Sequence, residues 1–228
     1  MGMTWFKALA VFGQELITDP RPIGAACPSS PRLARRVARM VGNSPEHYVL
    51  EIGAGTGSIT SALLKHCVPP ERLIALERSA SMVRLLQQRF QGVRIIEGDA
   101  CELTSLLARS GVSDLGRITH IVSSLPLRSL QPDQVQLITG EFLKVMKQRT
   151  QLIQYTYNLR HGSRELFDRL YQRSSSVVWL NLPPARVEAF STVPATEPRS
   201  GSRKRPPAKP APFVLTGGTK VVNASPRH

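Results

Sequence analysis

The sequence is poor in long apolar runs and in cysteine. Among its 228 residues no stretch reaches 18 consecutive apolar residues, so no membrane-spanning helix is expected. The first 20 residues lack a basic start and a small-residue cleavage site, and we therefore predict no signal peptide. The three cysteines, Cys27, Cys67 and Cys101, are too few and too far apart for a disulfide framework or a zinc site. These absences favour a protein of the cytoplasm that binds no metal.

Acidic residues are also scarce. The chain has 16 Asp and Glu against 30 Lys and Arg, a formal net charge of +14. Such an excess favours an anionic partner, either nucleic acid or an anionic membrane surface, and charge alone does not choose between them. Residues 194–228 are especially basic, with seven prolines, seven Lys or Arg and one acid. We predict a basic tail without a fixed fold, which either keeps the protein soluble or contacts phosphate-bearing surfaces.

What the sequence does contain is an alternation of strand and helix patterns. Short apolar segments, mostly rich in β-branched residues, predict strands at 48–54, 72–78, 93–99, 119–125 and 151–157. Helical patterns occur at 58–66, 79–90, 101–110, 132–148 and 163–173. Residues 175–193 predict two further strands joined at Asn181–Pro184. Buried strands that alternate with helices indicate an α/β fold, with a parallel sheet covered on both faces and a hairpin at its edge.

The most informative stretch is Val49–Thr60, VLEIGAGTGSIT. Its glycines Gly53, Gly55 and Gly57 alternate, and Glu51 precedes the first of them by two residues. A dinucleotide site would have the spacing G-x-G-x-x-G and would offer amide donors to a pyrophosphate. The spacing here is G-x-G-x-G, and the nearby carboxylate suits a ligand with positive charge. Since open α/β sheets bind ligands beyond the carboxyl ends of their strands, we expect this loop to line the site.

This stretch resembles motif I of the S-adenosylmethionine-dependent methyltransferases. The resemblance implies their class I fold, a Rossmann-like seven-stranded sheet with helices on both faces and an antiparallel C-terminal hairpin. It also implies S-adenosylmethionine as the cofactor. Glu77 in LIALER would accept hydrogen bonds from the ribose hydroxyls, and Asp99 in IIEGDA would accept one from the adenine amine. The predicted cofactor residues are Glu51, Gly53, Gly55, Gly57, Glu77, Asp99 and Ala100.

The segment HIVSSLPLRSL after the fourth predicted strand bears on the methyl acceptor. The first half of the chain resembles the ribosomal RNA adenine dimethyltransferases in VLEIGAGTGSIT, IALERSASMV and IIEGDA. Adenine N6-methyltransferases place an Asn or Asp and an aromatic residue at the end of the fourth strand, where they hold a flipped base. This chain has Ser124 and Leu127 instead. Methylation of ribosomal RNA is therefore disfavoured and stays the alternative.

A second resemblance spans Trp5 to Val193. The segments DPRPIGAACPSSPRLARRVARM, SSLPLRSL and LIQYTYNLR resemble the bacterial phospholipid N-methyltransferases. The resemblance implies stepwise methylation of phosphatidylethanolamine toward phosphatidylcholine, without a metal or a covalent intermediate. It makes an anionic membrane the expected partner and nucleic acid a disfavoured one, and it implies no obligate protein partner. Asn158 stands where we expect glycine or a similar residue followed by proline, so a related aminolipid stays open as the acceptor.

The same resemblance assigns residues to the acceptor side of the site. Ser124 and Tyr157 are the predicted catalytic residues, and the predicted substrate contacts are Leu125, Pro126, Arg128 and Tyr155. Arg128 would either pair with the lipid phosphate or be a solvated surface arginine. Because Tyr155 and Tyr157 alternate on a predicted strand, we expect only one to face the site. We favour Tyr157, which lies nearer the carboxyl end and whose ring suits a methylated cation.

Two N-terminal helices would bring the enzyme to a membrane. Trp5, Leu9 and Phe12 share one face of a predicted amphipathic helix. A second predicted helix is capped by Ser29 or Ser30 and has a basic stripe of Arg32, Arg35, Arg36 and Arg39. This stripe either docks on an anionic membrane or is a face exposed to solvent. We predict a peripheral enzyme at the inner face of the cytoplasmic membrane. Residues 1–42 would be its docking segment, 43–193 the methyltransferase domain and 194–228 the tail.

Overall fold

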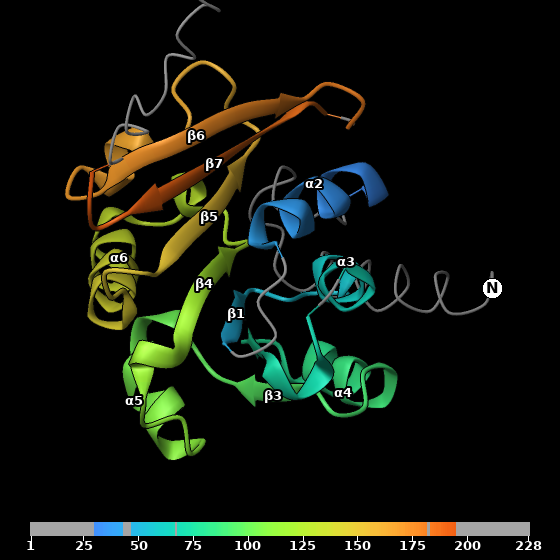
Figure 1. The fold of residues 1–228 in the computed structure, drawn as a ribbon. Helices are drawn as coiled ribbons and strands as arrows, with labels where there is room; N and C mark the ends of the chain where they lie inside the picture. Colours follow the sequence, from blue (N-terminus) through green and yellow to red (C-terminus); the bar gives the residue numbers. More distant parts are fainter. Residues whose placement is uncertain (1–29, 43–46, 67, 182, 195–228) are drawn as a thin grey trace, which may run out of the picture. The chain divides into compact units, whose positions relative to one another are not determined.

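The computed structural model describes residues 30–42, 47–66, 68–181 and 183–194 (Figure 1). The predicted amphipathic helix with Trp5, Leu9 and Phe12 and the tail after residue 194 lie outside these residues. Within the described part, no helix is both long enough and apolar enough to cross a membrane.

Seven strands form one sheet in the order β3-β2-β1-β4-β5-β7-β6. The five strands β3, β2, β1, β4 and β5 run parallel to one another, and β7 is antiparallel to both β5 and β6. This confirms the predicted class I sheet with its antiparallel C-terminal hairpin. The chain order reverses between β1 and β4, which is where open α/β sheets bind ligands. The strands are β1 (Tyr48–Ile52), β2 (Leu73–Glu77), β3 (Arg94–Glu97), β4 (Ile118–Ser123), β5 (Gln151–Thr156), β6 (Tyr171–Val178) and β7 (Ala185–Ser191).

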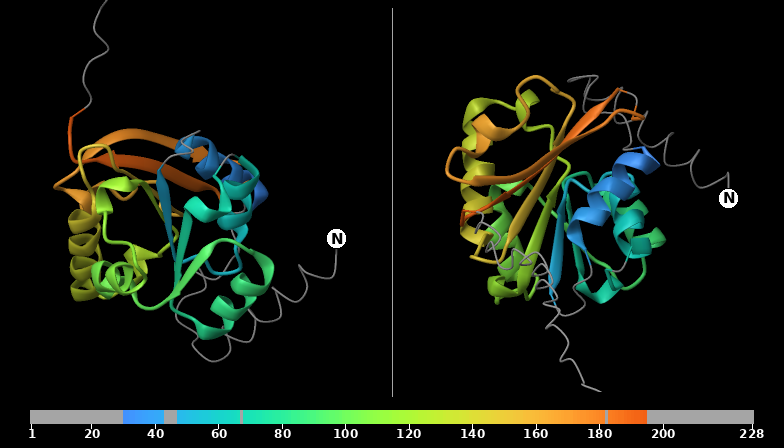
Figure 2. Two further views of the ribbon diagram at one scale, coloured as in Figure 1. Left: turned by 60° about the horizontal axis from the view of Figure 1, so that its bottom comes forward. Right: turned by 45° about the horizontal axis from the view of Figure 1, so that its top comes forward.

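Helices cover both faces of the sheet (Figure 2). One face packs against α2 (Pro31–Val41), α3 (Ser58–His66) and α4 (Ala80–Arg89), and the other against α5 (Leu103–Arg109) and α6 (Pro132–Val145). On β1, Val49 is buried toward α2 and α3, while Leu50 and Ile52 are buried toward α5 and α6. A strand buried on both faces reads as a continuous apolar run, and this is why the parallel strands were predictable. The connections contain the 3-10 helices η1 (Pro70–Arg72), η2 (Ala100–Glu102), η3 (Leu115–Arg117), η4 (Leu127–Ser129) and η5 (Arg164–Phe167).

Helix α2 begins at the predicted cap and is built into the core of the sheet domain. The Ser30 hydroxyl accepts a hydrogen bond from the Leu33 amide at 3.3 Å. Leu33 and Val37 are fully buried against α3 and the sheet. Nε of the half-buried Arg36 donates to Oγ of Ser176 on β6 at 3.1 Å. The other arginines of the predicted stripe are exposed, namely Arg32, Arg35 and Arg39.

The helix predicted at 163–173 is wrong. The structure has the short η5 over Arg164–Phe167, and β6 already begins at Tyr171. The local pattern RELFDRLYQR is amphipathic at helical spacing, but Tyr171–Val178 forms backbone pairs with β7 instead. The ring of Phe167 packs on Phe190 of β7, with centroids 5.0 Å apart. Pairing with a distant strand therefore outweighs the local helix propensity.

Candidate active site

The glycine loop, residues 53–57, follows β1 at the carboxyl edge of the sheet, as predicted. The Gly53 amide donates to the Leu76 carbonyl of β2 at 2.9 Å. The Ser124 amide, just after β4, donates to the Ile52 carbonyl at 2.9 Å. These hydrogen bonds hold the end of β1 between the ends of β2 and β4. The loop, Glu77 and Ser124 therefore share one edge of the sheet.

Glu51 lies fully buried on β1, directly before the loop. Its Oε2 accepts a hydrogen bond from Thr60 Oγ1 on α3 at 2.8 Å, whereas its Oε1 has no partner among the described residues. Burial raises the pKa of Glu51 to about 8, the Thr60 hydrogen bonds oppose this, and the nearby charge of Glu77 adds to it. A buried acid with one unpartnered oxygen fits a cationic ligand group, which would favour its ionised form.

The three glycines of the loop have different surroundings. At Gly55, where φ is +53°, a Cβ would meet nothing within 4 Å, so the main chain there is open to a ligand. At Gly57, where φ is +77°, a Cβ would lie 2.3 Å from the ring of Phe90, so this glycine allows α4 to pack on the loop. At Gly53 a Cβ would lie 3.0 Å from the side chain of Leu125. Direct ligand contact, predicted for all three, is best supported at Gly55.

Glu77 at the end of β2 joins the glycine loop to the start of α4. Its Oε2 accepts from the Gly55 amide at 2.8 Å, and its Oε1 accepts from the amides of Arg78 and Ser79 at 2.9 Å each. A carboxylate offers about four acceptor positions, so about one remains for a ligand hydroxyl. Ribose binding by Glu77 stays a prediction. The structure adds that the same side chain fixes the loop.

Asp99 follows β3 and caps η2. Its Oδ1 accepts from the Cys101 amide at 2.9 Å, and the Arg78 guanidinium lies 3.7 Å from its Oδ2. Burial acts to raise the pKa of Asp99, but the hydrogen bonds from Cys101 and the charge of Arg78 outweigh it, so the pKa lies below its usual value. Asp99 is therefore ionised at neutral pH and able to accept from an amine. Ala100, the next residue, is buried.

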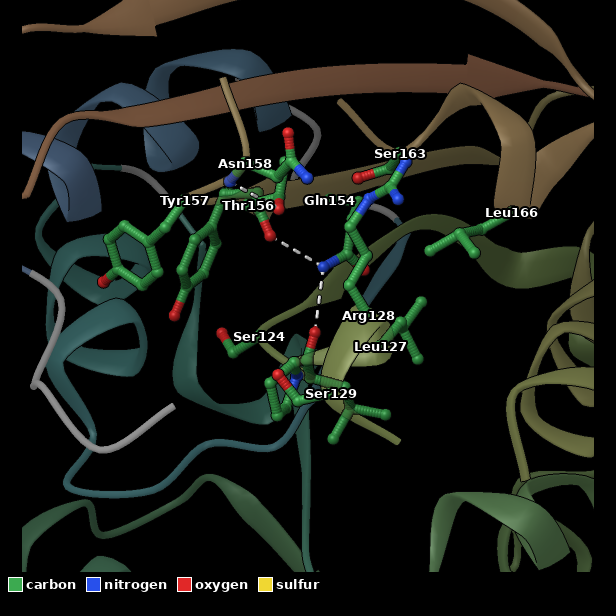
Figure 3. A pocket seen from close by; sticks show the side chains of 13 residues that line it. Ser124, Leu127, Arg128, Ser129, Gln154, Thr156, Tyr157, Asn158, Ser163 and Leu166 are labelled. Carbon is green, nitrogen blue, oxygen red and sulfur yellow. Dashed lines mark hydrogen bonds between the residues drawn. The ribbon is translucent and has the colours of Figure 1, made fainter. Parts of the chain in front are cut away.

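A cavity of about 190 Å³ lies beyond the ends of β4 and β5 (Figure 3). Its lining comes from residues 124–129, residues 154–158, Ser163 and Leu166. Figure 3 shows Ser124 and Tyr157 on one side of this cavity and Leu166 on the other. We call it the acceptor cavity. It brings together all the predicted catalytic and substrate residues, namely Ser124, Leu125, Pro126, Arg128, Tyr155 and Tyr157.

Gln154 is a lining residue that the sequence analysis missed. It is almost fully buried on β5, and its Nε2 donates to the carbonyls of Leu125 at 3.0 Å and Tyr155 at 2.8 Å. Since carbonyls only accept, the amide nitrogen must face them, and this fixes which way the amide is turned. Gln154 Oε1 then has no partner in the described part of the chain, and neither has the buried Oγ of Ser124. A polar residue inside the apolar strand LIQYT is the signal that could have identified Gln154.

The two tyrosines differ from the prediction that only one faces the site. Tyr155 and Tyr157 both line the acceptor cavity, and their rings meet edge to face with centroids 6.1 Å apart. The expectation was wrong because residues two apart along a strand point to the same face of the sheet. Both rings accordingly pack against the same hydrophobic cluster. The cavity is therefore walled by two aromatic rings.

Arg128 lies in the cavity wall but already has partners. Its Nε donates to the Gly162 carbonyl at 2.7 Å, and its Nη2 lies 3.2 Å from Glu165 Oε2. Both partners come from the segment around η5, so Arg128 ties the segment after β4 to it. A lipid anion would compete with Glu165 for this guanidinium.

The described residues gather no set of metal ligands in this site. Among the described residues, no group of three or more His, Cys, Asp and Glu could hold a metal ion. The chemistry that this arrangement supports is the alignment of a bound cofactor with a small polar acceptor. The glycine loop and its acids form one end, and the acceptor cavity forms the other.

Comparisons with known proteins agree with this geometry. Residues 49–149 match a family model described as a methyltransferase domain. An ornithine lipid N-methyltransferase of Singulisphaera acidiphila is 33% identical over 171 residues, which cover 72% of this chain and 85% of that protein. A probable ribosomal RNA small subunit methyltransferase A of Methanosarcina mazei is 29% identical, over 77% of this chain and 60% of that protein.

Solved structures show the same fold at low sequence identity. One is the 1,6-didemethyltoxoflavin-N1-methyltransferase of Burkholderia thailandensis, crystallised with bound S-adenosylhomocysteine. It is 15% identical, has a TM-score of 0.54, and the match covers 85% of this chain and 91% of that chain. A match at this identity supports the arrangement of strands and helices.

Proposed function

Because this chain belongs to the class I S-adenosylmethionine-dependent methyltransferases, we propose that it methylates the amine head group of a membrane lipid. The observation on which the proposal rests is the acceptor cavity. Two buried side-chain oxygens, Ser124 Oγ and Gln154 Oε1, lack partners among the described residues and lie in a cavity lined by two tyrosines. Buried polar groups are normally hydrogen-bonded, so such oxygens mark where a ligand's donors belong. An amine supplies those donors.

The residues at the cofactor end fit S-adenosylmethionine. Gly55 leaves its main chain open, and the buried Glu51 has an oxygen without a described partner, suited to the cofactor's ammonium. When bound, S-adenosylmethionine supplies an electrophilic methyl group. Since a Cβ at Gly53 would lie 3.0 Å from the side chain of Leu125, which lines the acceptor cavity, the glycine loop also borders that cavity.

In this proposal the chain acts by positioning the amine. Ser124 and Gln154 would accept its N–H bonds and leave the nitrogen lone pair directed toward the methyl donor, which is a gain in orientation. The rings of Tyr155 and Tyr157 would lie beside the cationic product. No Asp, Glu or His occurs among the described residues that line the cavity. We therefore assign the released proton to solvent rather than to a strong general base.

The lipid class follows from the head-group chemistry and from one relative. Phosphatidylethanolamine and ornithine lipid both present a primary amine close to an anionic group, and Arg128 lies in the cavity wall to meet such an anion. The ornithine lipid N-methyltransferase is similar over most of its length. We therefore propose an aminolipid as the acceptor, with these two as the candidates to compare.

Methylation of ribosomal RNA is the competing function, because such enzymes also match this chain. The geometry disfavours it. Ser124 replaces the Asn or Asp that would hold a base, and Leu127 is buried in the core instead of presenting an aromatic face. The chain also spans only 54% and 60% of the length of two of these relatives.

Labelled methyl transfer to defined vesicles tests the proposal. The full chain would receive methyl-labelled S-adenosylmethionine and vesicles of phosphatidylethanolamine, of ornithine lipid, or of N-acetylated phosphatidylethanolamine. We expect label in at least one of the two aminolipids and none in the acetylated lipid. Label in ribosomal RNA, with both aminolipids unlabelled, would contradict the proposal.

A pair of variants on one strand adds the residue-level test. Gln154→Met keeps the length of the side chain but removes the acceptor oxygen, together with the amide donor to the Leu125 and Tyr155 carbonyls. We expect kcat/KM to fall about 10- to 100-fold, the loss typical of a hydrogen bond to a group that is charged, as the nitrogen becomes in the transition state. Cofactor affinity should stay unchanged. Gln151→Met, at the other end of β5, is the matched control and should retain activity. Equal losses in the two variants would remove the assigned role of Gln154.

A further inference from the structure

The turn between β6 and β7 exposes two large apolar side chains in succession. Trp179 is 70% exposed and Leu180 is 72% exposed. We call residues 179–181 the hairpin tip. Its backbone is held, since the Asn181 amide donates to the Val178 carbonyl at 3.3 Å and Asn181 Nδ2 donates to the Pro183 carbonyl at 2.5 Å. A tryptophan and a leucine presented by an ordered turn are costly in water unless another surface covers them.

Strand register places the hairpin tip at the edge of the sheet that holds the active site. Thr156 at the carboxyl end of β5 pairs with Arg186, and Val178 pairs with Ala185, so residues 179–181, which follow Val178, project past the end of β5. Tyr157 and Asn158, which line the acceptor cavity, follow β5 at the same edge. Whatever covers the tip therefore also approaches the acceptor cavity.

The arginine face of α2 lies beside the hairpin tip. Figures 1 and 2 show α2 next to the end of the β6–β7 hairpin. The hydrogen bond from Arg36 to Ser176 fixes this arrangement, because Ser176 stands near the end of β6. The exposed arginines of α2 are Arg32, Arg35 and Arg39. Exposed apolar side chains beside cations match the interfacial region of an anionic membrane, where Trp is enriched and each basic residue adds attraction.

We infer that the hairpin tip inserts into the interfacial layer of an anionic lipid bilayer, with the arginine face of α2 against the lipid head groups. This surface turns the carboxyl edge of the sheet toward the bilayer, so a head-group amine reaches the acceptor cavity without leaving the membrane. The inference rests on the proposed function only for its choice of partner. It adds an anchor in the described fold to the docking proposed for the N-terminal segment.

Vesicle flotation of the full chain tests the inference. The double variant Trp179→Ser/Leu180→Ser should bind vesicles of phosphatidylcholine and phosphatidylglycerol at least tenfold more weakly than the unaltered chain. The matched control is Leu137→Ser/Tyr171→Ser, which removes two exposed apolar side chains, 58% and 52% exposed, from α6 and from the other end of β6. This control should bind normally. Replacing Arg32, Arg35 or Arg39 with Gln should weaken binding about fivefold each at low salt.

An activity assay separates this inference from the proposed function. On a water-soluble short-chain aminolipid the tip variant should keep full methyl transfer, while its activity on vesicles falls with its binding. Unchanged vesicle binding in the tip variant would overturn the docking inference, as would a tip-dependent change in RNA binding or in oligomeric state instead. Tip-dependent vesicle binding with no methyl transfer to any aminolipid would support docking and contradict the proposed function.

Discussion

The two ends of the candidate active site are built in different ways. At the cofactor end, Glu77 and Asp99 each stand at a strand end and already accept hydrogen bonds from backbone amides. At the acceptor end, Ser124 follows β4 and Gln154 lies on β5, and each has a buried oxygen without a described partner. The carboxylates of the first end are thus already hydrogen-bonded without a ligand, whereas the described residues supply no donor to the two oxygens of the second end.

Glu51 lies at the cofactor end but shares a feature of the acceptor end. It belongs to the cofactor end, yet its Oε1 has no described partner and its pKa is raised to about 8 by burial. Counted over the described residues, an unpartnered buried oxygen thus occurs once at the cofactor end and twice at the acceptor end. In each case we assign the missing donor to a ligand amine, and the predictions below test this assignment.

The largest effect is expected from Glu51→Gln on cofactor binding. Removing one partner of a buried ion pair costs about 3–5 kcal/mol, so affinity for S-adenosylhomocysteine should fall at least about 100-fold. Because Glu51 is mostly protonated at neutral pH, binding to the unaltered chain should also release up to about one proton. Calorimetry in buffers of different ionisation enthalpy measures both quantities. Tight binding to the variant, or binding without proton release, would contradict a contact between Glu51 and the cofactor.

The second effect separates packing from ligand contact within the glycine loop. Gly57→Ala places a methyl group against Phe90 at a positive φ, so the free energy of unfolding should fall by about 3 kcal/mol. Gly55→Ala faces open space and should cost about 1 kcal/mol of stability, from φ alone, while it obstructs the cofactor. Chemical denaturation of both variants, followed by a cofactor titration, checks this. Equal losses of stability would refute the distinction.

These glycines show what the sequence could and could not predict. The motif G-x-G-x-G, with acids at the ends of two further strands, was enough to predict that these residues gather at one edge of the sheet, because the carboxyl ends of parallel strands share an edge. It did not show that Gly57 packs against Phe90, because that contact depends on where α4 lies. Ser163 and Leu166 were missed because their place also depends on tertiary packing. The sequence predicted a helix at 163–173, whereas in the structure this segment lines the cavity.

The third effect concerns pH and stability. The pKa of Glu51 is raised in the folded chain, so between about 4.5 and about 8 the folded state binds more protons than the unfolded state. The free energy of unfolding should therefore fall as pH rises through this window, by about 2 kcal/mol from this group between about pH 6 and about pH 8. Denaturation of Glu51→Gln should lack this component of the fall. If the two proteins lose stability in parallel, Glu51 is ionised in the free enzyme.

The smallest effect is expected at the tyrosines of the acceptor cavity. Tyr157→Leu removes an aromatic face beside the forming cation. Because cation–π contacts are worth about 0.5–2 kcal/mol, we expect a loss of about 1 kcal/mol of transition-state stabilisation. This corresponds to a fall of about fivefold in kcat/KM for the last methylation step. Tyr157→Phe keeps the face and should retain activity. Steady-state kinetics with a dimethylated lipid as the acceptor measures this. A larger loss in the Phe variant would assign the role to the hydroxyl.

The most direct test of the account is a competition in one reaction. The chain would receive methyl-labelled S-adenosylmethionine together with total bacterial lipid vesicles and unmethylated small ribosomal subunits, and the labelled species would then be identified. We predict label on the amine of a lipid head group and none on RNA. Label on an adenine of the ribosomal RNA, with the lipid fraction unlabelled, would contradict the assignment of the acceptor cavity to a lipid amine.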